Sequence, residues 1–126
     1  MTAKAYVEHV AIWVHDIHWH IRFFRQVLGM EMREVQGDPA NPQQFWTLGG
    51  MQFMASPGFQ GPEGRLGHIG IMCDDLDAAL KAAQSFGVSA MPQGPNWLRL
   101  PDGLTVELIQ ARAGSVAQAL AVQPRD

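Results

Sequence analysis

The stretch HVAIWVHDI at residues 9–17 returns in altered form as HIGIMCDDL at residues 68–76. A constant spacing of 59 residues separates the two copies. The matched pairs are His9 with His68, Ile12 with Ile71, Asp16 with Asp75, and Ile17 with Leu76. Chance rarely produces several matches in one order, so the repetition indicates a structural unit that occurs twice in the chain.

Each copy predicts a strand followed by a helix. The extended segment is apolar on both faces, which is typical of a strand that is covered on both sides. Asp16 then suits the N-cap of a helix, because its carboxylate accepts from unpaired backbone N–H groups, and Gly29 ends that helix. In the second half Asp74 or Asp75 takes the capping role and Gly87 ends the helix.

Short strand-like segments, separated by turn residues, follow each predicted helix. The sequence therefore predicts a β-α-β-β-β module, present twice. The expected strands lie at residues 7–14, 32–35, 44–48, 51–55, 66–73, 88–91, 96–100 and 105–109, with turns at 37–42, 49–50, 93–95 and 101–103.

We expect a single α+β domain over residues 1–126, in which the two modules form a cupped mixed sheet with the helices on its outer face. The expected parts are module one at about 5–56, a linker at 57–65, module two at about 66–111 and a C-terminal tail at 112–126.

The composition excludes several function classes. Hydrophobic residues make up 47% and charged residues 17% of the 126 residues, which is too apolar for a disordered chain. The net charge of -3 and the scattered basic residues argue against nucleic-acid binding. No apolar run is long enough for a membrane span, and a single cysteine fits a reducing compartment, so a cytoplasmic location is expected.

Three potential metal ligands fall on strand faces that point away from the helices. Because successive side chains of a strand alternate between its faces, His9, His68 and Glu107 each alternate with aliphatic neighbours that suit packing against a helix. Two neutral imidazoles and one carboxylate leave coordination positions open for water or substrate, which is typical of a catalytic metal site.

The alternative interpretation is that both histidines are core residues and that Glu107 pairs with Arg99. The repeat, which places His9 and His68 at equivalent positions, favours the metal. His15, His18 and His20 are expected to be exposed or interfacial, although His15 falls on the face of His9 if the strand continues. Cys73 is expected to be a buried, inert thiol on the helix-facing side.

At these residues the chain resembles the vicinal-oxygen-chelate superfamily, which includes glyoxalase I, methylmalonyl-CoA epimerase, extradiol dioxygenases and the fosfomycin- and bleomycin-resistance proteins. The resemblance extends from Val7 to about Gln110, and HVAIWVHDI with FFRQVLGM, HIGIMCDDLDAAL and LPDGLTVELI carry it. It implies a half-barrel around one divalent metal ion held by His9, His68 and Glu107. It also implies a homodimer, in some members with modules of two chains sharing a site.

The chain departs from glyoxalase I at the second carboxylate ligand, which serves there as the base. An alignment of the repeats on Gly50 and Gly103 puts Met54 opposite Glu107. Gln52 is the nearby oxygen donor on the face of Met54, and methylmalonyl-CoA epimerase has a glutamine among its ligands. Gln52 is therefore a possible fourth ligand, but a carboxamide does not act as a carboxylate base.

The resemblance implies a metal-dependent enzyme of the lyase or isomerase type that acts on a small oxygen-rich substrate. Alternatives are an extradiol Fe(II) dioxygenase and a bleomycin-resistance-like binding module without catalysis. The metal is one of Fe, Mn, Ni, Zn, Co or Mg, and the base is a metal-bound hydroxide, a water positioned by Gln52, or His15. The candidate substrate pocket comprises Trp13, Met54, Met72, Trp97 and Arg99.

Overall fold

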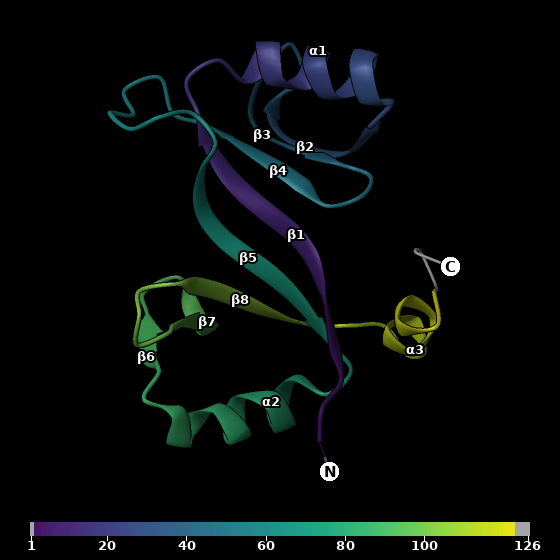
Figure 1. The fold of residues 1–126 in the computed structure, drawn as a ribbon, viewed down its shortest axis with the longest axis vertical. Coiled ribbons are helices and arrows are strands. Elements are labelled where there is room, and N and C mark those ends of the chain that lie inside the picture. Colours follow the sequence, from purple (N-terminus) through teal and green to yellow (C-terminus); the bar gives the residue numbers. More distant parts are fainter. Residues whose placement is uncertain (1, 123–126) are drawn as a thin grey trace. The chain divides into compact units, whose positions relative to one another are not determined.

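The computed structural model describes residues 2–122 and has the predicted order of elements (Figure 1). Its strands are β1 (Ala5–Val14), β2 (Met32–Asp38), β3 (Asn41–Thr47), β4 (Met51–Ala55), β5 (Arg65–Cys73), β6 (Ser89–Met91), β7 (Gly94–Arg99) and β8 (Thr105–Gln110). Its helices are α1 (Ile17–Leu28), α2 (Leu76–Ala83), the 3-10 helix η1 (Gln84–Phe86) and α3 (Ser115–Leu120). The strand order is β2-β3-β4-β1-β5-β8-β7-β6, which confirms the α+β class and the mixed sheet.

The chain divides into two compact units, and the boundary between them runs through β1 and β5. One unit comprises residues 9–68 and the other comprises residues 2–8 with 69–122. The predicted module bounds of about 5–56 and 66–111 stay a prediction. The end of the predicted tail, residues 123–126, lies outside the described residues. None of the helices within residues 2–122 has the length and apolar character that a bilayer-spanning segment needs.

In the unit of residues 9–68, α1 covers one face of the strands β2, β3, β4 and β1. Asp16 caps the helix by accepting from the backbone N–H of Trp19 at 3.1 Å, and Gly29 ends it in the left-handed conformation. Pairing of β1 with β4 is parallel, whereas β3 is antiparallel to both of its neighbours. The core between helix and sheet contains the buried side chains of Val14, Ile17, Phe45 and Phe53.

Phe53 is the residue on which this core depends most, because its side chain is fully buried and contacts the rings of Phe24 and Phe45. Truncation to Phe53→Ala is expected to lower the free energy of unfolding by about 3–5 kcal/mol through lost burial and the cavity left behind. Urea unfolding of both proteins measures this difference. The conservative Phe53→Leu variant should lose markedly less, and equal losses in the two variants would contradict the packing assignment.

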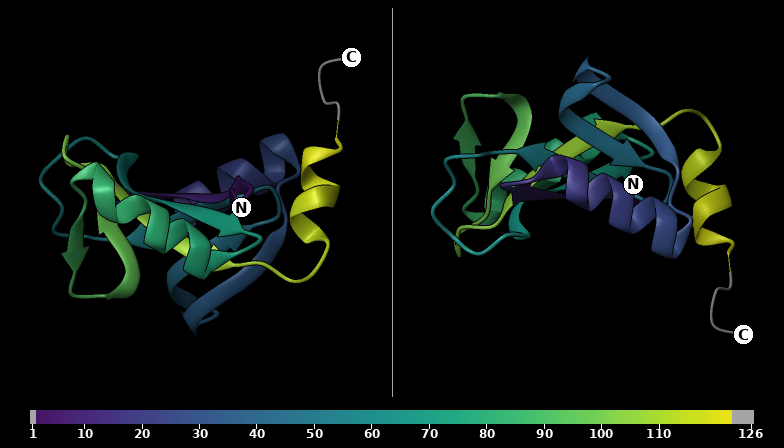
Figure 2. Two further views of the ribbon diagram at one scale, coloured as in Figure 1. Left: turned by 90° about the horizontal axis from the view of Figure 1, so that it is seen from below. Right: turned by 90° about the horizontal axis from the view of Figure 1, so that it is seen from above.

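The other unit repeats the arrangement with α2 on the strands β5, β8, β7 and β6, and each helix lies over the strands of its own unit (Figure 2). Asp75 caps α2 by accepting from the N–H of Ala78 at 3.0 Å, which decides between the two predicted caps. Cys73 is buried with Leu98, Val106 and Leu108, as predicted. Burial raises the pKa of the Cys73 thiol, so the thiolate is disfavoured.

Two of the predicted turns are shorter in the structure. The turn predicted at 37–42 spans only Pro39 and Ala40, because β3 begins at Asn41 and Pro42 pairs with Gly37 in the sheet. Proline lacks an N–H donor, and it is tolerated here at the start of a strand beside a register shift. Likewise the turn predicted at 93–95 lies at residues 92–93.

Candidate metal centre

Two buried histidines face each other at the centre of the sheet. His9 on β1 is 5% exposed and His68 on β5 is 8% exposed, and their Nε2 atoms are 3.0 Å apart. Two nitrogens that bind one ion at right angles and at about 2.1 Å lie about 3.0 Å from each other. In the structure the two Nε2 atoms form a hydrogen bond with each other, and their separation also suits two adjacent ligands of one cation.

The strand register explains why the two imidazoles avoid the helix layer. On β1, Ile12 and Val14 pack into the core beneath α1, so His9 and Ala11 point to the opposite face. On β5, Ile69 and Ile71 contact the core beneath α2, which leaves His68 on the other face. The alternation predicted from the sequence is confirmed on both strands.

His68 is held in its neutral form. Burial and, to a smaller extent, the charge of His9 together lower the pKa of His68 to about 4. At neutral pH the His68 imidazole therefore keeps a ring nitrogen without a proton, which is the form that coordinates a metal ion.

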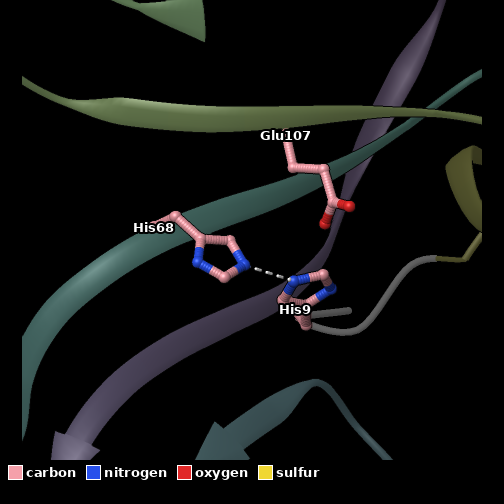
Figure 3. A group of neighbouring side chains, drawn as sticks. All are labelled: His9, His68 and Glu107. Atoms are coloured by element: carbon pink, nitrogen blue, oxygen red, sulfur yellow. Dashed lines mark hydrogen bonds between the residues drawn. The ribbon is translucent and has the colours of Figure 1, made fainter. Parts of the chain in front are cut away.

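Glu107 on β8 supplies the carboxylate. Its partner in the parallel β5–β8 pairing is Gly70, two residues after His68 and on the same strand face. The ligand atoms of His9, His68 and Glu107 all lie within 4.8 Å of one another, and the three side chains turn toward one another (Figure 3). Glu107 is half-buried, and carboxylates in such positions require a compensating charge or hydrogen bonds.

The register places Gln52, and not Met54, at the position equivalent to Glu107. Ala11 is the repeat partner of Gly70, and Ala11 pairs with Gln52 as Gly70 pairs with Glu107. The sequence alignment on glycines was wrong by two residues, because three residues join β3 to β4 whereas five join β7 to β8. At the position of the first module that is equivalent to Glu107, the chain therefore has a carboxamide and not a carboxylate.

Gln52 presents an oxygen that has no partner within the described residues. Its side chain is 3% exposed, and its Nε2 donates to the Oε1 of Gln44 at 2.7 Å. Its own Oε1 is buried without a hydrogen bond. Such an atom is costly unless something binds it, so the donor set of two imidazoles, a carboxylate and this amide oxygen fits a divalent cation.

Glu34 is a candidate site residue that the sequence did not indicate. In the sheet it lies in the same row of cross-strand neighbours as Gln52. On adjacent strands Glu34 pairs with Trp46, and Trp46 pairs with Gln52. These paired residues point to one face of the sheet, the face of His9. A bulge at Arg33 sets this direction, because Met32 pairs with Thr47 on the opposite face. An exposed carboxylate therefore lies on the ligand face, two strands from Gln52.

The predicted pocket residues fall into two groups. Trp13 and Met54 lie on the face of His9 and line a common cavity. Trp97 pairs directly with Glu107, which puts its side chain beside that carboxylate, and Met72 is half-buried on the same face of β5. Arg99 is exposed at the end of β7, opposite Thr105, where a guanidinium is solvated.

His15 and His20 were expected to be exposed or interfacial, but Glu63 of the linker binds both. The Nδ1 of His15 and the Nε2 of His20 each lie 3.1 Å from a Glu63 oxygen. The remaining nitrogen of His15 contacts the carbonyl of Phe59, and His20 is 9% exposed. Both ring nitrogens of His15 are thus engaged by residues of the linker. His18 is exposed, as predicted.

A duplicated β-α-β-β-β module is the fold of the vicinal-oxygen-chelate class. The family model described as Glyoxalase/Bleomycin resistance protein/Dioxygenase superfamily matches residues 8–99. The chain therefore belongs to this superfamily, as the sequence predicted. A comparison with curated proteins found no match.

Solved structures share the fold at low sequence identity. The hypothetical protein BH1468 from Bacillus halodurans C-125 is 15% identical, with a TM-score of 0.63 over 88% of this chain and 97% of that one. Methylmalonyl-CoA epimerase from Mycobacterium tuberculosis is 20% identical, with a TM-score of 0.60 over 88% and 91%. The Mn(II)-bound glyoxalase from Novosphingobium aromaticivorans is 18% identical, with a TM-score of 0.61 over 86% of this chain and 40% of that one.

Proposed function

We propose that the protein is a divalent-metal-dependent isomerase or lyase that acts on a small substrate with two neighbouring oxygens. One observation carries the proposal: the ligand atoms of His9, His68 and Glu107 gather within 4.8 Å of one another. The unpartnered Oε1 of Gln52 supports it, because this atom would complete the shell on the same face. Metal binding by a glyoxalase of the same fold is consistent with the assignment.

In the proposed mechanism His9, His68, Glu107 and Gln52 hold the cation. When bound, a divalent cation supplies Lewis acidity, which polarises a carbonyl of the substrate and acidifies the neighbouring C–H bond. Glu34 is the proposed base. Its carboxylate would accept the proton from that carbon and either return it to the neighbouring carbonyl carbon while the hydroxyl proton moves to the former carbonyl oxygen, for an isomerase, or pass it to a leaving group, for a lyase.

The residues around the ligands have supporting roles. Trp46 lies between Glu34 and Gln52 in the same row, so its indole stands between the base and the metal ligand. Gln52 carries no charge, so that position cannot compete with Glu34 for the proton. In this proposal metal ligation and proton transfer therefore belong to different side chains, Gln52 and Glu34.

Exchange of substrate protons with solvent tests the reaction class. Protein reconstituted with Mn²⁺ in D₂O is expected to exchange the α-protons of hydroxyacetone, which has two neighbouring oxygens, faster than those of acetone, which has one. Removal of the metal with EDTA should lower the exchange of hydroxyacetone to its rate in buffer alone, as NMR measures directly. Exchange that persists unchanged without metal would contradict the proposal. Oxygen uptake with Fe²⁺ and catechol would instead indicate a dioxygenase, because the same type of triad holds the iron of these enzymes.

Gln44 is expected to tune metal affinity without touching the ion. Its Oε1 accepts from the Nε2 of Gln52, which fixes the carboxamide so that the oxygen stays free for the metal. Gln44→Leu removes that acceptor, and metal affinity should fall about tenfold, the usual cost of losing an outer-shell partner. Gln44→Glu keeps the acceptor and should keep the affinity. Calorimetric titration with Mn²⁺ measures both, and Gln43→Leu on the neighbouring exposed residue is the control.

A further inference from the structure

A cavity of about 450 Å³ opens on the ligand face of the unit formed by residues 9–68. Trp13, Gln44 and Met54 line it from three neighbouring strands, and the pairing of β1, β3 and β4 places all three on the face of His9 and Gln52. Its size falls in the range of small-molecule sites. Asn41, Pro42 and Pro57 are also among the lining residues.

The lining of this cavity contains no ionisable side chain. The other two cavities described within residues 2–122 differ in this respect. Lys4, Asp74 and Arg112 line the cavity beside α3, and the cavity beside α1 has two arginines and Glu31. A charged group that entered the uncharged cavity would lose hydration without gaining a counter-charge, which is unfavourable. The cavity therefore selects an uncharged occupant.

The walls of the cavity suit a flat apolar group. Trp13 is 37% exposed, so its indole has free surface at the cavity. A side chain at Gly67 would lie 2.4 Å from the Cε of Met54 and 3.3 Å from the indole nitrogen of Trp13, so both side chains pack against a bare backbone that fixes them. An aromatic ring placed against an indole and a thioether gains stacking and sulfur contacts. The amides of Asn41 and Gln44 offer hydrogen bonds at the edge.

Gln44 connects the cavity to the metal ligands, because it lines the cavity and also accepts from Gln52. We propose that this cavity receives an uncharged aromatic part of the substrate whose oxygens reach the metal. The role of the occupant as substrate rests on the proposed function, whereas the selectivity of the cavity for neutral rings does not.

Binding of two matched probes tests the selectivity on metal-free protein. 2-Naphthol is neutral at pH 7 and 2-naphthoate is an anion on the same ring system. Titration followed by proton NMR should give 2-naphthol an affinity at least about tenfold higher than 2-naphthoate, since leaving one charge uncompensated costs at least about 1.4 kcal/mol. Asn41→Lys introduces a cation at an exposed lining residue and should narrow or reverse this difference. Equal affinities of wild type for both probes, or no binding of 2-naphthol, would overturn the proposal.

Trp13→Ala and Trp19→Ala form a matched pair of variants. Trp19 is 48% exposed and stacks on Phe23 of α1, away from the cavity residues. The affinity for 2-naphthol should fall about tenfold in Trp13→Ala, which removes a ring contact and its buried area, and stay unchanged in Trp19→Ala. Similar losses of affinity in the two variants would show that the probe binds to exposed aromatic side chains in general. That result would refute binding of 2-naphthol in the cavity.

A second arm places the cavity relative to the metal. Paramagnetic Mn²⁺ bound by the wild type should increase the relaxation rate of the bound 2-naphthol protons, and His68→Ala should abolish this increase while the probe still binds. If the protein binds Mn²⁺ but the probe protons relax normally, the cavity is not part of the site and the inference fails. If the wild type binds no Mn²⁺, the proposed function fails instead, while the selectivity for neutral rings stands on the first arm.

Discussion

His68→Ala is expected to abolish stoichiometric binding of Mn²⁺. The substitution removes one of two imidazoles whose Nε2 atoms lie 3.0 Å apart, and the remaining ligands cannot replace a nitrogen at that position. Affinity should fall by more than about 100-fold, beyond the loss caused by outer-shell partners. His9→Ala and Glu107→Gln should behave in the same way. Metal analysis after equilibrium dialysis, together with calorimetric titration, measures the loss.

Two controls distinguish the removal of a metal-binding side chain from unfolding and from nonspecific effects of the substitution. Thermal unfolding of the metal-free variants should show a folded protein, with a destabilisation of at most about 3 kcal/mol, in the range usual for single substitutions. His18→Ala changes an exposed histidine at the start of α1 and should bind one ion per chain like the wild type. Full metal content in all three ligand variants would show that the ion, if bound, lies elsewhere.

Glu34→Gln should lower kcat in the exchange reaction by about 10²–10⁴-fold, the contribution typical of a general base. The carboxamide has the same shape but no basic oxygen, and Glu34 is absent from the group of ligand atoms around His9. Metal affinity should therefore stay close to that of the wild type. Initial rates of proton exchange at saturating Mn²⁺ and substrate measure the effect.

The neighbouring Glu31 provides the matched control for this prediction. It is also exposed, but it precedes β2 and has no partner in the row that leads to Gln52. Glu31→Gln should retain the rate of the wild type. A Glu34→Gln variant with undiminished kcat would assign proton transfer to another group, and a parallel loss of metal affinity would instead make Glu34 a ligand.

Much of the fold could be predicted because local physics and the repeat agree. Aspartate caps at residues 16 and 75 and a left-handed glycine at 29 bound the helices where the sequence indicated. Because successive side chains of a strand alternate between its faces, the sequence separated His9 and His68 from the aliphatic residues of the core. Only one of the two possible orientations of each strand packs the aliphatic residues against the helix. The candidate ligands therefore followed from the sequence.

The remaining features depend on information that periodicity does not contain. Alignment by glycines failed at Gln52 because the two equivalent turns differ by two residues, which only the strand register reveals. Glu34 was missed because the bulge at Arg33 reverses the expected alternation of Met32 and Glu34. The pairing of His20 with Glu63 joins α1 to a linker whose path the sequence does not define.

The most direct test of the metal centre is anomalous diffraction from crystals grown with Mn²⁺. One peak per chain is expected, bonded to the Nε2 atoms of His9 and His68 and to a carboxylate oxygen of Glu107, with the Oε1 of Gln52 facing the ion. A peak beside Glu63 and His20, or protein crystals without any bound Mn²⁺ at a saturating concentration, would contradict it.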